Sequence, residues 1–250
     1  MAISFINVAT NQNLTESTSF TFTKPTNAAT GDLLIGVVAN GRTTASNSDY
    51  ACTGWTELED VYDATGINVQ MAVFTRVVQA GDPASWTGSS SVSLEYQSIV
   101  WCLRGADSTL LASETAVTNG TANSTYTSAT VNNTDSGAWR LGAVVWTDSA
   151  GSASSTVSGN TERLDTGILN VTGLDEMMMA ACDSNGAIAT GNTSITWTPA
   201  TSGQEDGITW IGLVAPTAGS ATNAPSGAGA ATATSNAPKA GVGAKAQVIG

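Results

Sequence analysis

The sequence contains no histidine and only 8 basic residues, and it has no long apolar segment. The absence of histidine excludes the Ser/His/Asp and Cys/His nucleophile systems and the commonest general base. Against 20 acidic residues the basic ones leave a net charge of −12, so the chain lacks the basic surface that nucleic-acid binding requires. Apolar runs such as LLIGVV (residues 33–38) are too short to cross a bilayer. We therefore expect neither nucleic acid nor membrane as a partner.

Cysteine is also scarce, with Cys52, Cys102 and Cys182 as the three examples. Their spacing fits no metal-binding motif. The N-terminal residues have no basic region followed by a long apolar stretch, so no signal peptide is expected and folding would occur in a reducing cytoplasm. We predict three free thiols, with a Cys52–Cys102 disulfide as the alternative. No phosphate-binding loop or dinucleotide fingerprint is present, and we expect no cofactor and no bound metal.

Short strands account for most of the pattern that is present. The segments TSFTFTK (residues 18–24), INVQMAVFTRVV (67–78) and SVSLEYQSIVW (91–101) are rich in β-branched and aromatic residues and end at turn-forming ones. No helical periodicity of 3.6 residues is found. The sequence predicts about ten to twelve short strands, in an all-β, jelly-roll-like antiparallel β-sandwich.

The strands recur along the chain. Residues 31–38, 54–57, 71–81 and 100–106 match residues 137–144, 159–162, 176–186 and 210–216 in the same order, with offsets of 105 to 110. This spacing indicates an internal duplication, with units of about residues 16–106 and 122–216 that together build one sandwich over residues 1–216. A glycine inside each central strand, Gly36 and Gly142, predicts a bulge or a close backbone crossing.

Two acidic clusters are the candidates for catalysis. ELEDVYD contains Glu57, Glu59, Asp60 and Asp63, and GQEDG contains Glu205 and Asp206. A glycosidase needs only two suitably spaced carboxylates, and calcium favours oxygen ligands. Neither cluster has a supporting loop motif, so we interpret them as a solvated strand face and a turn. We predict no catalytic residue and no enzymatic activity.

The seven tryptophans raise the alternative of sugar binding, because aromatic rings stack on sugars. Three lie in apolar strand runs and are expected in the core: Trp101, Trp146 and Trp210. Four lie near turns or strand starts and are candidates for exposure: Trp55, Trp86, Trp139 and Trp197. Exposure of Trp55, Trp86 and Trp197 on one face would favour a carbohydrate-binding adhesion module.

The composition changes after Pro216. Residues 217–250 consist almost entirely of small and turn-forming residues, which bury too little surface to fold alone. The segment is either a flexible linker or an extended C-terminal arm that lies on a partner subunit. We predict the arm, and its candidate partner-binding residues are Lys239, Val242, Lys245, Val248 and Ile249.

Four stretches carry a resemblance to a known type of domain: GDLLIGVVANGRT, GWTEL, MAVFTRVVQAGDPASWT and IVWCLRGAD, within residues 31–107. Over about residues 16–216 the chain resembles a domain of tailed-bacteriophage structural proteins and of some bacterial surface proteins. The resemblance carries no catalytic residues. Arg76 and Arg104 match its pattern, and we interpret them as fold-stabilising ion pairs.

The resemblance implies a function in the virion. It favours a capsid decoration or cement protein, with a minor tail protein as the alternative. The expected partners are further copies of the chain, in a homo-oligomer, and other virion proteins such as the major capsid protein. Assembly would take place in the host cytoplasm.

Overall fold

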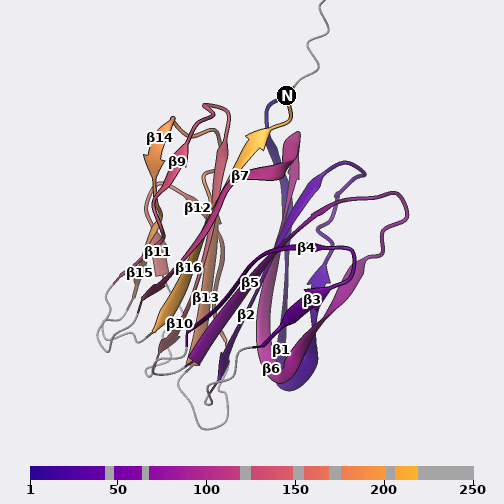
Figure 1. The fold of residues 1–250 in the computed structure, drawn as a ribbon, viewed down its shortest axis with the longest axis vertical. Helices are drawn as coiled ribbons and strands as arrows, with labels where there is room; N and C mark the ends of the chain where they lie inside the picture. The colour runs from indigo at the N-terminus through magenta and orange to yellow at the C-terminus, as the bar shows by residue number, and fades with distance from the viewer. Residues whose placement is uncertain are drawn as a thin grey trace, which may run out of the picture. The chain divides into compact units, whose positions relative to one another are not determined.

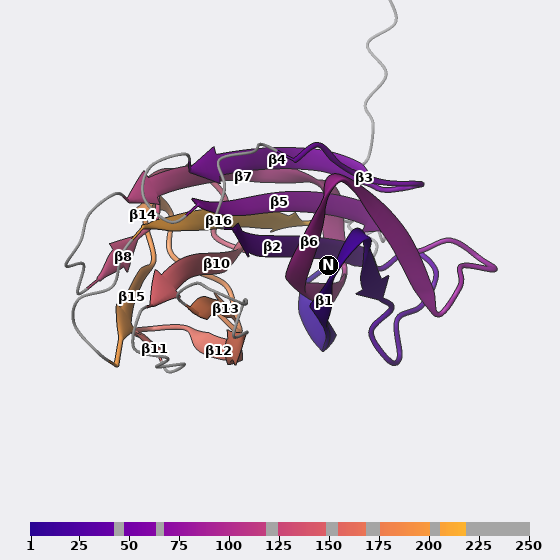
Figure 2. The same cartoon turned by 90° about the horizontal axis from the view of Figure 1, so that it is seen from below.

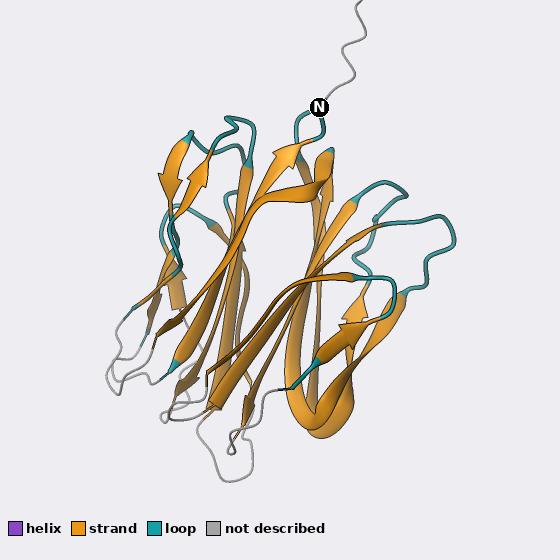
Figure 3. Ribbon diagram, viewed as in Figure 1, coloured by secondary structure: helices purple, strands orange, loops and turns teal. Residues whose placement is uncertain are grey.

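The structure is a computed structural model that describes residues 1–42, 48–63, 68–118, 125–148, 155–168, 176–200 and 206–218. Residues Met1–Ala218 form one compact unit. The described residues form strands and turns but no helix (Figure 3). The predicted all-β, antiparallel class is confirmed. The predicted number of strands is too low, because the described residues contain sixteen strands, two of them 20 residues long.

The first main sheet comes from the first half of the chain. Its strands run in the order β1-β6-β2-β5-β4, and β3 pairs separately with β6. The strands are β1 (Ser4–Thr23), β2 (Leu33–Arg42), β3 (Tyr50–Cys52), β4 (Thr56–Asp63), β5 (Asn68–Val77) and β6 (Ser85–Arg104).

The second main sheet comes from the residues that follow Gly105, in the order β12-β13-β10-β16-β7. Its strands are β7 (Ala106–Thr118), β10 (Trp139–Asp148), β12 (Thr161–Ile168), β13 (Glu176–Asp183) and β16 (Gly207–Pro216). Two small sheets, β11-β15-β8 and β14-β9, accompany it. They consist of β8 (Tyr126–Thr127), β9 (Val131–Asn133), β11 (Ser155–Val157), β14 (Gly191–Thr193) and β15 (Thr196–Pro199).

The long strands β1 and β6 each contribute to two layers. Residues up to Asn13 pair with the second half of β6 in the main sheet. The register then slips between Asn13 and Ser19, and residues 19–23 pair with residues 85–89. This second part of the hairpin, together with β3, covers the outer side of the first main sheet (Figure 1).

Apolar residues fill three clusters. Alternate residues of the central strands, such as Ile35, Trp101 and Leu141, form an inner cluster between the two main sheets. Their sequence neighbours point the other way, because side chains alternate along a strand. Val100 therefore joins a first outer cluster, and Val144 joins a second one, which includes residues of the small sheets. Figure 2 shows strands β8, β11 and β15 of the small sheets beside the second main sheet. Burial on both faces explains why the central strands read as continuous apolar runs.

The two main sheets have the same strand order. Strands β7, β16, β10, β13 and β12 occupy the places that β1, β6, β2, β5 and β4 occupy in the first sheet. Each of the four sequence matches joins two strands that occupy the same place in their sheets. Between the sheets β2 packs against β10, β4 against β7 and β1 against β12, as a twofold rotation would require. The correspondence supports the duplication, which remains a prediction, as does the jelly-roll topology.

The predicted bulges at the strand glycines are wrong. Pairing runs without a register shift through Gly36, which faces Phe74 and Val100, and through Gly142, which faces Cys182 and Ile211. A side chain of an outer layer approaches each glycine instead of a crossing backbone.

Candidate functional site

One ion pair joins the beginning of β2 to the end of β6. The Nε and Nη2 atoms of Arg104 donate to the Asp32 carboxylate at 2.9 and 2.8 Å, and the Ala29 N–H donates at 2.8 Å. Asp32 is buried. Burial would raise the pKa of its carboxyl group, but the bonds from Arg104 and Ala29 outweigh burial, so the pKa is lowered. The pair ties the GDLL motif to the CLRGA motif.

A second ion pair holds the turn between β5 and β6. Arg76 donates to the Asp82 carboxylate and to the Gly54 carbonyl oxygen. Its guanidinium lies over the Trp86 ring, 5.2 Å from the centroid. The bond from Arg76 is the main reason why the pKa of Asp82 is lowered. Gly54 adopts φ +81°, a conformation that favours glycine.

These contacts bring the resemblance motifs together as parts of the fold. The interpretation of Arg76 and Arg104 as fold-stabilising ion pairs is confirmed. Sequence reasoning did not identify their partners, Asp32 and Asp82, although both lie inside the motifs. It also missed the ion pair of Arg163 with Asp183 in the second half, at 2.6 Å.

The acidic residues of β4 lie along an edge strand of the first main sheet. Glu57 is exposed, Glu59 and Asp60 are half-buried, and Asp63 is buried. The predicted solvated face thus holds for Glu57 and is wrong for Asp63. Strand β4 packs against β7 of the second sheet, so it is not fully open to solvent.

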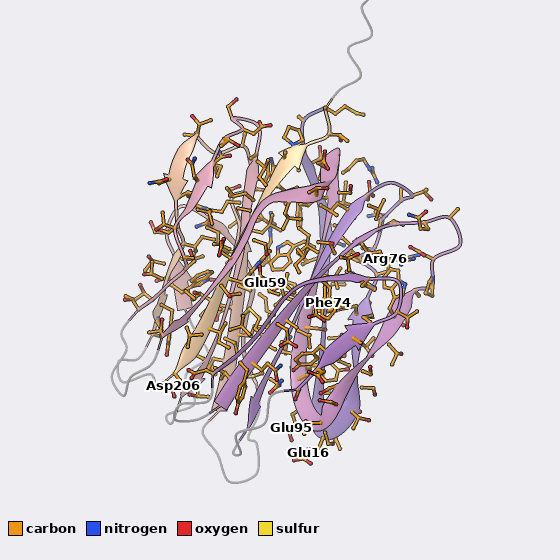
Figure 4. The ribbon with its side chains drawn as sticks, in the orientation of Figure 1. Glu16, Glu59, Phe74, Arg76, Glu95 and Asp206 are labelled. Atoms are coloured by element: carbon orange, nitrogen blue, oxygen red, sulfur yellow. The ribbon has the colours of Figure 1, made fainter. Side chains whose placement is uncertain are left out.

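Burial is the largest cause of raised pKa values at Glu57, Glu59 and Asp60. The charge of Glu114 on β7 adds to the effect at Glu59, whereas a hydrogen bond with Ser113 opposes it. Glu95 behaves similarly, since burial and the neighbouring Glu16 raise its pKa (Figure 4).

The second acidic cluster is only partly described. Glu205 lies outside the described residues. Asp206 is buried, so the predicted solvated turn is wrong at this residue. Among the described residues no group of three His, Cys, Asp or Glu side chains could hold a metal ion. The described part of the chain also contains no helix that could span a membrane.

Two pockets open near the ion pairs. One of about 240 Å³ is lined by Leu33, Thr56, Thr75, Arg76, Val77 and Ser108. The other, of about 310 Å³, is lined by Met1, Thr30, Gly31, Asp32, Arg104, Gly105, Ala106 and Thr217. Asp32 is the one residue in these two linings that carries a carboxylate, and this carboxylate is already bound by Arg104. Neither lining supplies the two carboxylates that glycoside hydrolysis needs.

All seven tryptophans are buried. The core positions expected for Trp101, Trp146 and Trp210 are confirmed, and the four candidates for exposure are buried as well. The outer clusters contain Trp55, Trp86 and Trp197, whereas Trp139 belongs to the inner cluster. Trp55 packs on Phe22 and Trp86, with ring centroids 4.8 and 5.2 Å apart. The tryptophan platform for sugars is therefore not formed.

The three cysteines are free and buried, as predicted. Burial raises the pKa of Cys52 to about 11 and that of Cys102 to about 12, and it raises the pKa of Cys182 as well. Thiols held in the neutral form are poor nucleophiles. The alternative Cys52–Cys102 disulfide is not present.

The predicted partner-binding residues Lys239, Val242, Lys245, Val248 and Ile249 lie outside the described residues. The structure describes where their segment begins. Pro216 pairs with Ala106, and both the backbone N–H and the hydroxyl of Thr217 donate to the Gly105 carbonyl oxygen at 2.8 Å. The segment therefore starts beside the Arg104–Asp32 pair.

The chain matches no protein-family model, no curated protein and no solved structure.

Proposed function

We propose that the chain is a non-enzymatic structural protein of a tailed-phage virion that binds neighbouring capsid subunits as a decoration or cement protein. The observation that carries the proposal is the place of the resemblance motifs in the fold. Gly54, Arg76 and Asp82 meet in one cluster, and Asp32 and Arg104 meet in another. These motifs fix turns and strand ends, as expected if the resemblance concerns a scaffold for attachment.

The distribution of charge supports attachment through the C-terminal segment. All 20 acidic residues precede residue 219, whereas residues 219–250 contain two lysines and no acidic residue. Three arginines of the preceding part are bound in ion pairs: Arg76, Arg104 and Arg163. The acidic part of one copy and the lysine-bearing segment of another are thus complementary, and such attraction weakens as salt rises.

Apolar contacts alone would not hold the segment in place. Burial of Val242, Val248 and Ile249 would contribute on the order of 5 kcal/mol, whereas ordering a chain costs about 1 kcal/mol or more per residue. Backbone hydrogen bonds to the partner must therefore contribute. Many copies on one particle would add avidity.

The alternative is that the chain is a minor tail protein, since the resemblance applies to capsid decoration proteins and to minor tail proteins alike. The alternative of a carbohydrate-binding adhesion module has less support, because Trp55, Trp86 and Trp197 are buried.

The experiment is to purify virions made from the genome that encodes this chain, separate heads from tails, and quantify the chain in each by mass spectrometry. The proposal expects many copies on heads. Recovery on tails alone would establish the minor tail alternative. Absence of the chain from purified virions would refute both.

A further inference from the structure

An exposed turn after β13 carries an Asn-Gly pair in an unusual environment. Asn185 is exposed and adopts φ +48°. Its backbone N–H donates to the Asp183 carboxylate at 2.8 Å. Asp183 also forms an ion pair with Arg163. Asn185 therefore contacts both charged groups, Asp183 through its backbone and Arg163 through its side chain.

The side-chain carbonyl of Asn185 is polarised. The Nη2 atom of Arg163 donates to its Oδ1 at 3.0 Å. A hydrogen bond from a cation draws electron density from the carbonyl and stabilises negative charge that develops on the oxygen when a nucleophile attacks the carbon.

The neighbouring nucleophile is accessible. In the described residues no acceptor binds the Gly186 N–H, although the Gly186 carbonyl oxygen accepts from the Ser184 hydroxyl at 2.6 Å. A Cβ atom built at Gly186 meets nothing closer than the Ser184 oxygen at 4.0 Å. The turn is therefore open on this side, and glycine itself adds no steric barrier.

The geometry points to Asn185 as a site of spontaneous deamidation. The Gly186 nitrogen attacks Cγ of Asn185, a nitrogen–carbon bond forms, and the side-chain amide leaves as ammonia with the proton from Gly186. The product is a five-membered succinimide. Water then opens one of its two carbonyls and yields aspartate or isoaspartate at position 185.

A second Asn-Gly pair serves as an internal comparison. Asn40 and Gly41 lie in β2, where they pair with Gln70 and Val69 of β5. Asn40 is buried, and its side-chain amide donates to the Tyr50 hydroxyl. Paired strands oppose the backbone rotation that ring closure needs, so Asn40 is protected. A third pair, Asn119–Gly120, lies outside the described residues.

The two products differ in their effect on the fold. Aspartate keeps an oxygen in position to accept from Arg163. Isoaspartate adds a methylene group to the backbone and moves the carboxylate away from the guanidinium. Arg163 also lies over the Phe5 ring, 3.6 Å from its centroid, so the isoaspartate form disturbs the contact between β12 and β1.

The test is peptide mapping of the full chain during storage at neutral and mildly alkaline pH, with Asn185 and Asn40 scored separately. We expect Asn185 to convert faster than Asn40 by roughly tenfold or more, which corresponds to about 1.4 kcal/mol in the barrier. In denaturant the two rates should converge, since both pairs then lack structure.

Gly186→Ala is the matched variant, because the open space accepts a methyl group and the fold should be kept. It should slow conversion at position 185 and leave Asn40 unchanged. Asn185→Asp, a mimic of one product, should keep the thermal midpoint of the parent. The inference is overturned if folded Asn185 is as stable as Asn40, or if Gly186→Ala leaves its rate unchanged.

Discussion

Gly36 and Gly142 occupy equivalent places in the two main sheets, and each lies under an aromatic ring from its own outer layer. A Cβ atom at Gly36 would lie 2.9 Å from the Phe22 ring, and one at Gly142 would lie 3.0 Å from the Trp197 ring. Both glycines are in the central strand of their sheet. Each half of the chain thus uses one glycine to bring an outer layer into close contact with the sheet.

Gly36→Ala and Gly142→Ala should each destabilise the protein. A methyl group at Gly36 would displace the Phe22 ring, and one at Gly142 would displace the Ile195 side chain and press on the Trp197 ring. Such overpacking typically costs about 1–3 kcal/mol. The measurement is the free energy of unfolding in denaturant. Gly186→Ala is the control and should change this value by less than about 0.5 kcal/mol. Equal values for all three variants would contradict the packing described.

The ion pairs should differ in their contribution to stability. Arg163→Gln leaves the carboxylate of Asp183, whose side chain is fully buried, without its cation, and such losses cost about 3–5 kcal/mol. Arg104→Gln also leaves a buried carboxylate, that of Asp32, but it should cost less because the Arg104 side chain is 51% exposed and water can reach the place of its guanidinium. Thermal unfolding of both variants tests the order. A larger loss for Arg104→Gln would contradict it.

The pH dependence of stability should have two limbs. The pKa values of Asp32 and Asp82 are lowered from an ordinary 3.8. The stability that these two carboxylates contribute is fully present above pH 3.8 and is lost as the pH falls through their pKa values in the folded protein. The pKa of Glu59 is raised from 4.5. Its neutral form favours the fold, so stability falls as pH rises from 4.5 through the folded value.

Glu59→Gln and Asp32→Asn should separate the two limbs. Glu59→Gln removes the unfavourable charge and should flatten the decline on the high-pH side. Asp32→Asn should lower stability at neutral pH and flatten the decline on the acid side. Unfolding by denaturant across a pH series provides the comparison. Parallel curves for both variants and the parent would show that neither carboxylate contributes.

The three thiols should be unreactive in the folded protein. Burial raises the pKa of Cys52 to about 11, and the thiolate is the reactive form. A chromogenic disulfide reagent should therefore label none of Cys52, Cys102 and Cys182 until denaturant is added. Rapid labelling of any of them under native conditions would contradict their burial.

The sequence was sufficient to predict the strands and their antiparallel class. These features depend on local alternation and on turn residues, which neighbouring positions reveal. The core positions of Trp101 and Trp210 were predictable for the same reason, because both lie within apolar runs.

The outer layers could not be predicted. Trp55 is buried by Phe22 and Trp86, which come from distant parts of the chain. Local periodicity reports which side of a strand is apolar, but it does not reveal that another layer covers a turn. The partners of the arginines were missed for a similar reason, since Asp32 and Arg104 are 72 positions apart.

The most direct test of the proposed function is attachment to particles by the full chain and by a variant that ends at Ala218. The shorter variant keeps the bonds of Thr217 to Gly105, so its thermal midpoint should match that of the full chain. On virions that lack the protein, the full chain should bind and be released by salt. The shorter variant should bind weakly or not at all. Equal binding by both would contradict attachment through residues 219–250, and binding by neither would contradict a place in the virion.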